Sequence, residues 1–333
     1  MPMSYQLFLS PPALPATVQR ILLITLSNIG DVVLTTPVLQ ALHIRYPDAL
    51  IDIVGDARSH QVYQHCPFLG RVLLKNKQTG WRGLLTLLRQ LRRVPYDLAV
   101  DLRTDGLLYA IRAKVRLGKL SNQASLGMHS VEKHFAALQP LGINDIPHPQ
   151  VWLTMRHRQH ARLLTAPFQG QRLLAIGLGA NSSHKIWPVS AYLALVYKLE
   201  MHVDAVMLLG SQQERCHADQ FRQQCRLPVL DVCGQLDILQ STAMLEHALL
   251  FVGNDSGLGH LASAVGTPTF TIFGLGQPAR YRPWGELAGW HQSPHGSMEA
   301  ITPEIIADAM FRHWMRCETG SVKHQGLRQQ ALV

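Results

Sequence analysis

The sequence predicts an α/β protein that consists of two doubly wound domains in tandem. Its 333 residues exceed what one ordinary hydrophobic core accommodates, so two domains are expected. Short apolar runs alternate with longer amphipathic segments, which is typical of parallel βαβ units with helices on both faces of a sheet. The pattern occurs twice, because LLITLSNIGD (residues 22–31) and LLAIGLGANSS (residues 173–183) each predict an opening strand followed by a glycine turn.

The strands and helices can be placed along the chain from these runs. In the first half, a helix through about Tyr46 follows the opening strand at residues 22–26, and a second helix is predicted at residues 83–93. Further strands of the first half are predicted at residues 50–55, 71–75 and 97–102. The second half has a predicted helix from about Val189 to Leu199. Its strands are predicted at residues 172–179, 204–210, 228–234, 249–253 and 269–274.

These elements divide the chain into four parts. The parts are an N-terminal extension (residues 1–19), a first doubly wound domain (20–150), a second one (151–317) and a polar tail (318–333). Prolines interrupt both periodicities at residues 144–153, which predicts a linker. Both glycine turns follow strands, so we expect them at the carboxyl edges of the sheets, where open α/β folds bind ligands.

The composition is that of a globular protein with anionic partners. Hydrophobic residues make up 47% of the chain, charged residues make up 16%, and the formal net charge is +9. This charge favours nucleic acid, an acidic membrane surface or a phosphorylated substrate, without choosing among them. The N-terminus lacks the basic and continuous apolar regions of a signal peptide, and no apolar run approaches the roughly 18 residues of a membrane-spanning helix. We therefore expect a cytoplasmic protein that at most touches a membrane.

Several kinds of site lack their usual sequence signals. The cysteines are odd in number and form no C-x-x-C pair, which argues against disulfides and structural zinc. They are Cys66, Cys216, Cys225, Cys233 and Cys317. No G-x-G-x-x-G, P-loop, H-E-x-x-H, G-x-S-x-G or RNP motif occurs. The basic residues Arg89, Arg92 and Arg93 have few aromatic residues among them, and we interpret them as a solvated helix face.

The first glycine turn carries a carboxylate where an anion site would be expected. In LSNIGDVVL (residues 26–34), Asp31 follows Gly30 at a predicted helix start, and such starts usually attract phosphate. A carboxylate would repel phosphate at this place. The purely structural alternative is that Asp31 caps a helix that begins at Val32.

The strongest local pattern is FVGNDSGLGHLASAVGTPTFTIFG, residues 251–274. A buried strand ends in a polar loop, and a helix of small residues starts at about Leu258. Ser256 and Gly257 can bring backbone N–H groups close to a diphosphate, and Asp255 can accept hydrogen bonds from sugar hydroxyls. The alternative is that Asp255 or Ser256 merely caps the helix.

A second polar loop, GANSSHKIWP (residues 179–188), directly follows the first strand of the second half. Ser182 and Ser183 offer hydroxyl and backbone donors, and Lys185 offers a mobile cation, which together suit a leaving diphosphate. Pro188 fits the first turn of the next helix. The alternative is that Lys185 is an ordinary surface lysine.

These segments resemble the ADP-heptose:lipopolysaccharide heptosyltransferases, a glycosyltransferase family. The resemblance rests on RILLITLSNIGDVVLTTPVLQAL, on K-x-W-P at Lys185 to Pro188, and on GNDSGLGHLASAVGTPTFTIFG. It extends from about Arg20 to about Pro278 and includes YDLAVDLRTDGLLYAIRAKVRLGK and HSVEKHFAALQPLGI. The D-S-G-L-x-H stretch with its following T-P-x-x-x-I-F-G strand is the specific part.

The resemblance implies a GT-B fold, with two Rossmann-like domains that face a central cleft. It also implies an inverting, metal-independent transfer of heptose from ADP-heptose to a lipopolysaccharide inner-core acceptor, with no cofactor and with Asp31 as the general base. Lys185 would neutralise the leaving diphosphate. The donor-binding residues implied are Ser182, Ser183 and Lys185 for the diphosphate, Asp255 for the sugar, Ser256, Gly257 and His260 for the lining of the site, and Glu214 for the ribose.

The first domain would then bind the acceptor, at the inner face of the inner membrane. Basic residues cluster in the sequence around the predicted strand end DLRTDG and can meet acceptor phosphates or carboxylates. They are Arg103, Arg112, Lys114, Arg116 and Lys119. The alternative for this cluster is a generic solvated surface.

The sequence leaves three other functions open. One is a GT-B-fold protein that binds a nucleotide sugar or a glycolipid without turnover, and another is a transferase that uses a different sugar donor. The third is a nucleic-acid binder driven by net charge, which we rank last, so no nucleic-acid partner is expected.

Overall fold

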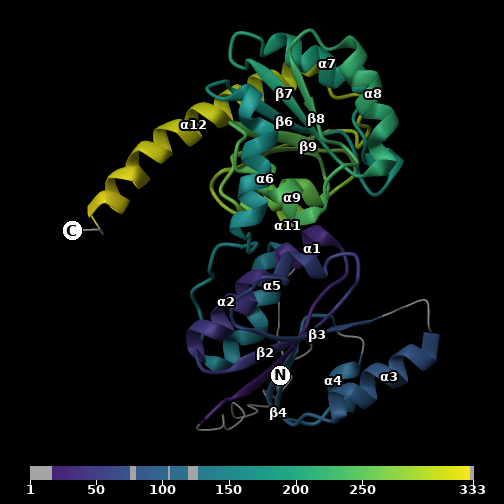
Figure 1. The fold of residues 1–333 in the computed structure, drawn as a ribbon, viewed down its shortest axis with the longest axis vertical. Coiled ribbons are helices and arrows are strands. Elements are labelled where there is room, and N and C mark those ends of the chain that lie inside the picture. The colour runs from purple at the N-terminus through teal and green to yellow at the C-terminus, as the bar shows by residue number, and fades with distance from the viewer. Residues whose placement is uncertain (1–16, 76–79, 104–105, 119–126, 331–333) are drawn as a thin grey trace, which may run out of the picture. The chain divides into compact units, whose positions relative to one another are not determined.

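The chain forms two compact units, each built around a parallel sheet (Figure 1). The computed structural model describes residues 17–75, 80–103, 106–118 and 127–330, with the backbone alone for residues 318–330. The first unit contains the described residues up to Ser27 together with residues 35–60 and 66–147. The second unit contains residues 28–34, residues 61–65 and the chain from His148 onward.

The first unit has five parallel strands in the order β3-β2-β1-β4-β5. Apolar residues make the central strands, and β1 buries Ile21 to Ile24 between its neighbours. The strands are β1 (Arg20–Ile24), β2 (Leu50–Gly55), β3 (Leu69–Leu74), β4 (Tyr96–Asp101) and β5 (Ala113–Gly118). The α-helices are α2 (Thr36–Arg45), α3 (Gly80–Arg92), α4 (Leu107–Ala110) and α5 (Ser130–Phe135), and a 3₁₀ turn lies at η4 (Ala136–Leu141). The 3₁₀ turn η1 (His60–Tyr63) begins in this unit at His60, and its other residues belong to the second unit.

The second unit has six parallel strands in the order β11-β10-β9-β6-β7-β8. They are β6 (Leu173–Gly177), β7 (Ala205–Leu209), β8 (Val229–Asp231), β9 (Leu250–Asn254), β10 (Thr269–Phe273) and β11 (Ala288–Gln292). Its α-helices are α1 (Ile29–Val33), α6 (Met155–Thr165), α7 (Val189–Lys198), α8 (Arg215–Gln224), α9 (Ile238–Leu245), α10 (Gly257–Ala264), α11 (Pro278–Tyr281) and α12 (Pro303–Gln330). Its 3₁₀ turns are η5 (Ala166–Phe168), η6 (Ser183–Lys185) and η7 (Gln212–Glu214).

The predicted strands are confirmed, but two edge strands were missed. Strand β5 reads AKVRLG and buries only Val115 and Leu117, so its alternation resembled a surface cluster of charges rather than a core strand. Strand β11 reads AGWHQ and leaves Trp290 44% exposed, which also gives a weak apolar signal. Edge strands bury less of their surface than central ones, and the apolar-run criterion therefore failed there.

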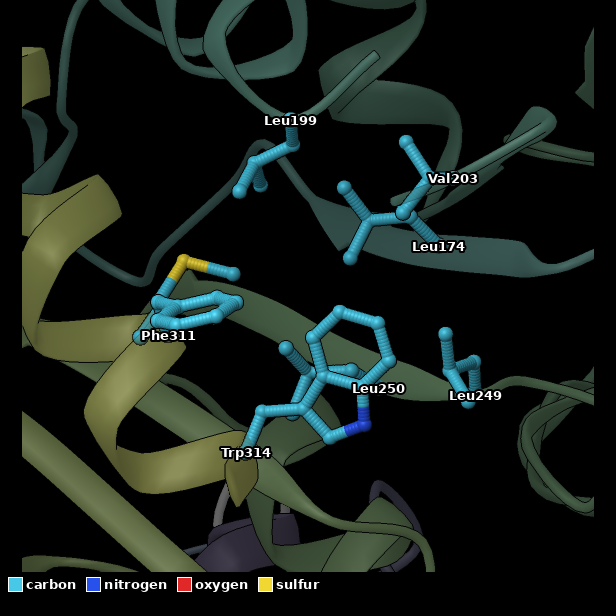
Figure 2. Close-up of a pocket in the computed structure, with 8 residues that line it drawn as sticks. Leu174, Leu199, Val203, Leu249, Leu250, Phe311 and Trp314 are labelled. Atoms are coloured by element: carbon cyan, nitrogen blue, oxygen red, sulfur yellow. The ribbon is translucent and has the colours of Figure 1, made fainter. Parts of the chain in front are cut away.

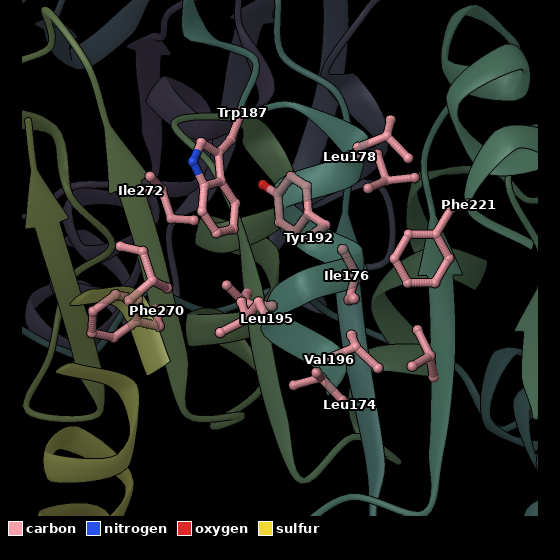
Figure 3. Close-up of a cluster of buried hydrophobic side chains, with 14 of the residues drawn as sticks. Leu174, Ile176, Leu178, Trp187, Tyr192, Leu195, Val196, Phe221, Phe270 and Ile272 are labelled. Atoms are coloured by element: carbon pink, nitrogen blue, oxygen red, sulfur yellow. The ribbon is translucent and has the colours of Figure 1, made fainter. Parts of the chain in front are cut away.

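The core of the second unit lies around Trp187 and Tyr192, which pack edge to face with ring centroids 4.9 Å apart and 76° between the ring planes (Figure 3). Strand residues such as Ile176 and Ile272 flank them. Trp187 is fully buried, and its Nε1 donates a hydrogen bond of 3.0 Å to the carbonyl of Ile301. This packing fixes the segment that joins the loop after β6 to helix α7.

Helix α12 covers the amino ends of β6 and β9. An apolar pocket lies between the helix and these strand ends (Figure 2). It is lined by Leu174, Leu199, Val203, Leu249, Leu250, Met310, Phe311 and Trp314. The pocket is therefore at the opposite end of these strands from the polar loops. The helix runs on through most of the segment that the sequence predicted as a separate polar tail, to Gln330.

Three further findings concern disulfides, metal sites and membrane-spanning helices. All five cysteines are free. Within the described residues, no three His, Cys, Asp or Glu side chains gather as they do around a metal ion. No described helix combines the length and the apolar character needed to cross a bilayer.

Candidate active site

The polar loops of the second unit meet where its strand order reverses. The chain builds β6, β7 and β8 in one direction and then returns to place β9 on the other side of β6. Such a reversal leaves a crevice at the carboxyl ends of the two central strands, and open α/β sheets bind ligands there. The loops after β6 and β9 are the two that contain the predicted donor residues.

The side chain of Asn254, the last residue of β9, joins these loops. Its Nδ2 donates to the carbonyl oxygens of Leu178 (3.1 Å) and Gly179 (3.4 Å), which follow β6. Its Oδ1 accepts from the backbone N–H of Trp187 (2.9 Å) and from the hydroxyl of Tyr192 (3.0 Å). Asn254 is fully buried, so these four bonds satisfy an amide that would otherwise be costly to bury.

Lys185 and Asp255 form an ion pair that joins the loops after β6 and β9. The Lys185 ammonium donates to Asp255 Oδ2 at 2.6 Å, with 28% and 15% of the two side chains exposed. The alternative that Lys185 is an ordinary surface lysine therefore loses support. Beside it, the Ser182 hydroxyl lies 2.8 Å from His184 Nδ1, and Ser183 is exposed.

Ser256 occupies the N-cap position of helix α10 without capping it. Its backbone is extended (φ −147°, ψ 172°), and its side chain makes no cap hydrogen bond. The hydroxyl oxygen is buried and has no hydrogen-bond partner among the described residues. The alternative that Asp255 or Ser256 merely caps this helix is therefore wrong, because Asp255 pairs with Lys185 and the Ser256 hydroxyl makes no bond to the helix. The first N–H groups of α10 lie beside this hydroxyl, which is the donor arrangement that an anion requires.

Helix α1, which contains Asp31, packs against the first turns of α10 within the second unit. A Cβ atom at residue 30 would lie 2.5 Å from Cδ2 of the buried His260 ring, and one at residue 257 would lie 3.1 Å from the Cβ of Ile29. Both positions are glycine, so the two helices approach closely. Of the predicted donor-site lining, Gly257 and His260 thus form the contact between α10 and α1.

Asp31 is the third residue of α1, not a cap for a helix that begins at Val32. The helix begins at Ile29, and Asn28 is its N-cap residue. Asn28 Nδ2 donates to Asp31 Oδ2 at 3.0 Å, and the Asp31 side chain is half-buried. The capping alternative for Asp31 is therefore wrong, since the helix starts earlier than the sequence indicated.

Glu214 lies at the carboxyl edge of the same sheet, after β7, the strand next to β6. It closes a capping box in which its Oε2 accepts from the backbone N–H (2.7 Å) and the hydroxyl (2.6 Å) of Ser211. Its side chain also lies against Cα of Gly179, where a Cβ would collide with it. Glu214 is thus next to the loop after β6, but its carboxylate already serves the turn after β7.

The first unit has its own reversal, between β1 and β4, and an arginine spans it. Arg103 follows β4, and its guanidinium donates to the hydroxyl of Ser27 in the loop after β1 at 2.7 Å. Next to this loop, after β2, Arg58 donates to both carboxylate oxygens of Asp56 (2.9 and 3.0 Å). This pairing holds the pKa of the Asp56 carboxyl well below its usual range.

Arg58 was missed by the sequence analysis. The signal that could have revealed it is its position in LIDIVGDAR, three residues past the end of a predicted strand. Its side chain is 60% exposed, so it presents a cation at the same edge as Arg103.

The structure does not bring together the four predicted acceptor residues that it describes. Lys114 lies near the start of β5 and pairs with Asp97 at 2.8 Å, and Arg112 precedes that strand. Arg116 donates to backbone carbonyls of Leu108 and Ile111. Only Arg103 lies at the carboxyl edge, because residues close in sequence spread along a strand by about 3.3 Å per residue. Lys119 lies outside the described residues.

Comparisons with known proteins agree on one family. A family model described as glycosyltransferase family 9 (heptosyltransferase) matches residues 105–302. Lipopolysaccharide heptosyltransferase 3 of Escherichia coli K12 is 28% identical over 291 residues, which cover 77% of this chain and 83% of that protein. Lipopolysaccharide core heptosyltransferase OpsX of Haemophilus influenzae is 21% identical over 285 residues, with 80% and 82% covered.

Solved structures agree on the fold. A family 9 glycosyl transferase from Veillonella parvula superposes with a TM-score of 0.80 at 18% identity and covers 91% of this chain and 99% of its own. The E. coli heptosyltransferase WaaC, solved with ADP, gives a TM-score of 0.71 at 18% identity, with 89% and 100% covered. These similarities confirm the predicted GT-B fold class.

The role of Asn254 can be tested by stability. We expect Asn254→Ala to lower the free energy of unfolding by about 3 kcal/mol, because it leaves several buried polar groups without partners. The matched control is Tyr192→Phe, which removes only hydroxyl bonds and should cost about 1 kcal/mol. Urea unfolding followed by circular dichroism measures both. Equal destabilisation by the two variants would contradict the role assigned to Asn254.

Proposed function

Since this chain belongs to glycosyltransferase family 9, the heptosyltransferases, we propose that it transfers heptose from ADP-heptose to the lipopolysaccharide core. Membership makes it a glycosyltransferase, and hence a transferase. The observation that carries the proposal is the group formed by the Lys185–Asp255 pair, the buried Ser256 hydroxyl and the start of helix α10. Each of these suits one part of a nucleotide diphosphate sugar.

In the proposed donor site, Lys185 and α10 hold the diphosphate. An ammonium group has three N–H donors, so Lys185 can keep its bond to Asp255 and still donate to phosphate oxygens. Ser256 and the first N–H groups of α10 supply further donors, and the helix dipole favours the negative charge. Ser182 and Ser183 lie on the same loop as Lys185, and the second oxygen of Asp255 remains able to accept from a sugar hydroxyl. The WaaC structure with ADP supports adenine as the base.

Asp31 is the proposed general base. In an inverting transfer, the acceptor hydroxyl gives its proton to the carboxylate while its oxygen bonds to the anomeric carbon and the bond to the diphosphate breaks on the opposite face. Asn28 fixes the carboxylate by a hydrogen bond. The carboxylate lies in the first turn of α1, where the positive end of the helix dipole attracts negative charge.

The proposed acceptor contacts are Arg103 and Arg58 at the carboxyl edge of the first unit. Both can meet the carboxylates or phosphates of an inner-core acceptor through paired N–H donors. The net charge of +9 fits work on an anionic glycolipid, and we propose that the protein acts as a peripheral enzyme at the cytoplasmic face of the inner membrane.

Donor selectivity tests the proposed function most directly. We expect ADP and ADP-heptose to raise the melting temperature more than UDP, GDP or CMP do, because a ligand that binds only the folded state stabilises it. Transfer of heptose from ADP-heptose to an inner-core lipopolysaccharide acceptor should accompany this shift, and mass spectrometry measures it. Stabilisation without any transfer would favour a binding protein without turnover. A larger shift in melting temperature with another nucleotide would favour a different sugar donor. Salt-dependent binding to DNA, without stabilisation by any nucleotide, would favour a nucleic-acid-binding protein.

Asp31→Asn tests the general base. The amide keeps the size of the side chain but cannot take the proton, so turnover should fall by roughly 10² to 10⁴-fold while folding and the ADP-induced shift in melting temperature persist. Single-turnover transfer assays measure the loss. A variant that transfers heptose at nearly the parent rate would reduce Asp31 to a structural residue.

Lys185→Ala tests the proposed metal-independent stabilisation of the leaving group. Loss of the ammonium should lower kcat on the order of 10²-fold, as the loss of one transition-state donor does in other enzymes. EDTA should leave the rate of the parent enzyme unchanged. The proposal fails if EDTA abolishes transfer and magnesium restores it, or if the alanine variant turns over normally.

A further inference from the structure

Helix α3 (Gly80–Arg92) of the first unit covers the core with only part of its apolar face. Leu87 and Leu91 are buried in the core cluster around Tyr96, and Leu88 packs partly against it. All three lie in the second half of the helix. None of the described residues of this core cluster comes from the first half of the helix.

The uncovered half of that face exposes three large apolar side chains. Trp81 is 68% exposed, Leu84 is 44% exposed and Leu85 is 40% exposed. With Leu88 they occupy positions i, i+3, i+4 and i+7, so they form one stripe along the helix. Neighbouring exposed apolar side chains of this kind, flanked by polar residues, are typical of surfaces that bind another protein or a membrane. We name Trp81, Leu84 and Leu85 the α3 stripe.

Arginines line one side of the α3 stripe. Arg82, Arg89 and Arg93 recur at helical spacing next to it, and Arg82 lies over the Trp81 ring with its Cζ 5.6 Å from the centroid. Between Asp56 and Asp97 the sequence has no acidic residue. The basic residues in that interval are Arg58, Arg71, Lys75, Lys77, Arg82, Arg89, Arg92 and Arg93. By sequence the last three are expected to form a solvated helix face, but the exposed apolar stripe beside them indicates a binding surface.

We propose that α3 is the surface by which this protein binds an anionic lipid bilayer, with the α3 stripe inserted among the acyl chains and the arginines at the headgroups. An apolar stripe with an interfacial tryptophan and flanking arginines is the pattern of helices that lie in a membrane surface. The inference rests on the proposed function only in taking the acceptor to be a membrane glycolipid.

Two other occupants fit the α3 stripe less well. A second copy of the chain would pair the surface with itself, and its arginines would then face arginines. A nucleic acid would use the arginines but would leave Leu84 and Leu85 against a charged backbone, because one tryptophan makes no stacking platform. The bilayer alone uses both the apolar and the basic parts.

Vesicle co-sedimentation of the full chain tests the proposal. The parent protein should bind phosphatidylcholine vesicles that contain phosphatidylglycerol about tenfold more tightly than pure phosphatidylcholine vesicles. Trp81→Ser/Leu85→Ser and, separately, Arg82→Gln/Arg89→Gln should each weaken binding to the anionic vesicles about tenfold. The matched control is Arg156→Gln/Leu163→Ser on helix α6, where Arg156 is exposed and Leu163 is 75% exposed. This control should bind as the parent does.

Each outcome decides the proposal independently of catalysis. Unchanged vesicle binding in both α3 variants, or an equal loss in the α6 control, overturns it. Equal binding to neutral and anionic vesicles overturns the role of the arginines, and a parent dimer that the serine variant abolishes, seen by light scattering, identifies a second copy as the occupant. The glutamine variant leaves the stripe intact, so it tests the idea even if the serine variant folds poorly. The ADP-induced shift and transfer to a detergent-dispersed acceptor should persist in both α3 variants, whereas failure of the proposed function would abolish transfer in the parent too.

Discussion

The buried amide of Asn254 is the interaction on which the rest of the candidate active site depends. Its four hydrogen bonds tie the end of β9 to the loop after β6 and to the start of the segment that leads into α7. Lys185 lies between these tied points, and Asp255 directly follows Asn254. The ion pair between them therefore follows from the amide's geometry. No charged side chain could replace the amide, because the position requires two donors and two acceptors in a fully buried place.

The two sheets use the same topological feature with different chemistry. In the second unit a neutral amide spans the reversal of strand order, which leaves Lys185 and the start of α10 to determine the local charge. In the first unit Arg103 spans it by donating to Ser27, and Arg58 lies over Asp56 nearby. The arrangement in the second unit suits a diphosphate surrounded by donors. The arrangement in the first unit offers partly exposed guanidinium groups, which suit an anionic acceptor that binds from solvent and leaves to solvent.

The sequence was sufficient for the fold and for the loops of the site, but not for the partners within them. Central strands such as β1 and β9 are continuous apolar runs, so they and the loops that follow them could be predicted. Strand β5 could not, because an edge strand alternates and its lysine and arginine imitate a charge cluster. The role of Asn254 and the pairing of Lys185 with Asp255 escaped prediction for another reason. Hydrogen bonds between distant residues depend on tertiary geometry, which no local pattern contains.

Asp31 shows how a carboxylate is accommodated at a helix start where a bound phosphate would be expected. Because α1 begins at Ile29, the carboxylate lies within the first turn, where Asn28 donates to it and the helix dipole stabilises it. The position of this turn is set by the missing side chains of Gly30 and Gly257, since a Cβ at residue 30 would collide with His260. The glycine turn therefore does not cradle phosphate, as glycine turns after strands often do. Its glycine allows α1 to approach α10, and this approach brings the helix of the proposed base to the helix of the proposed donor site.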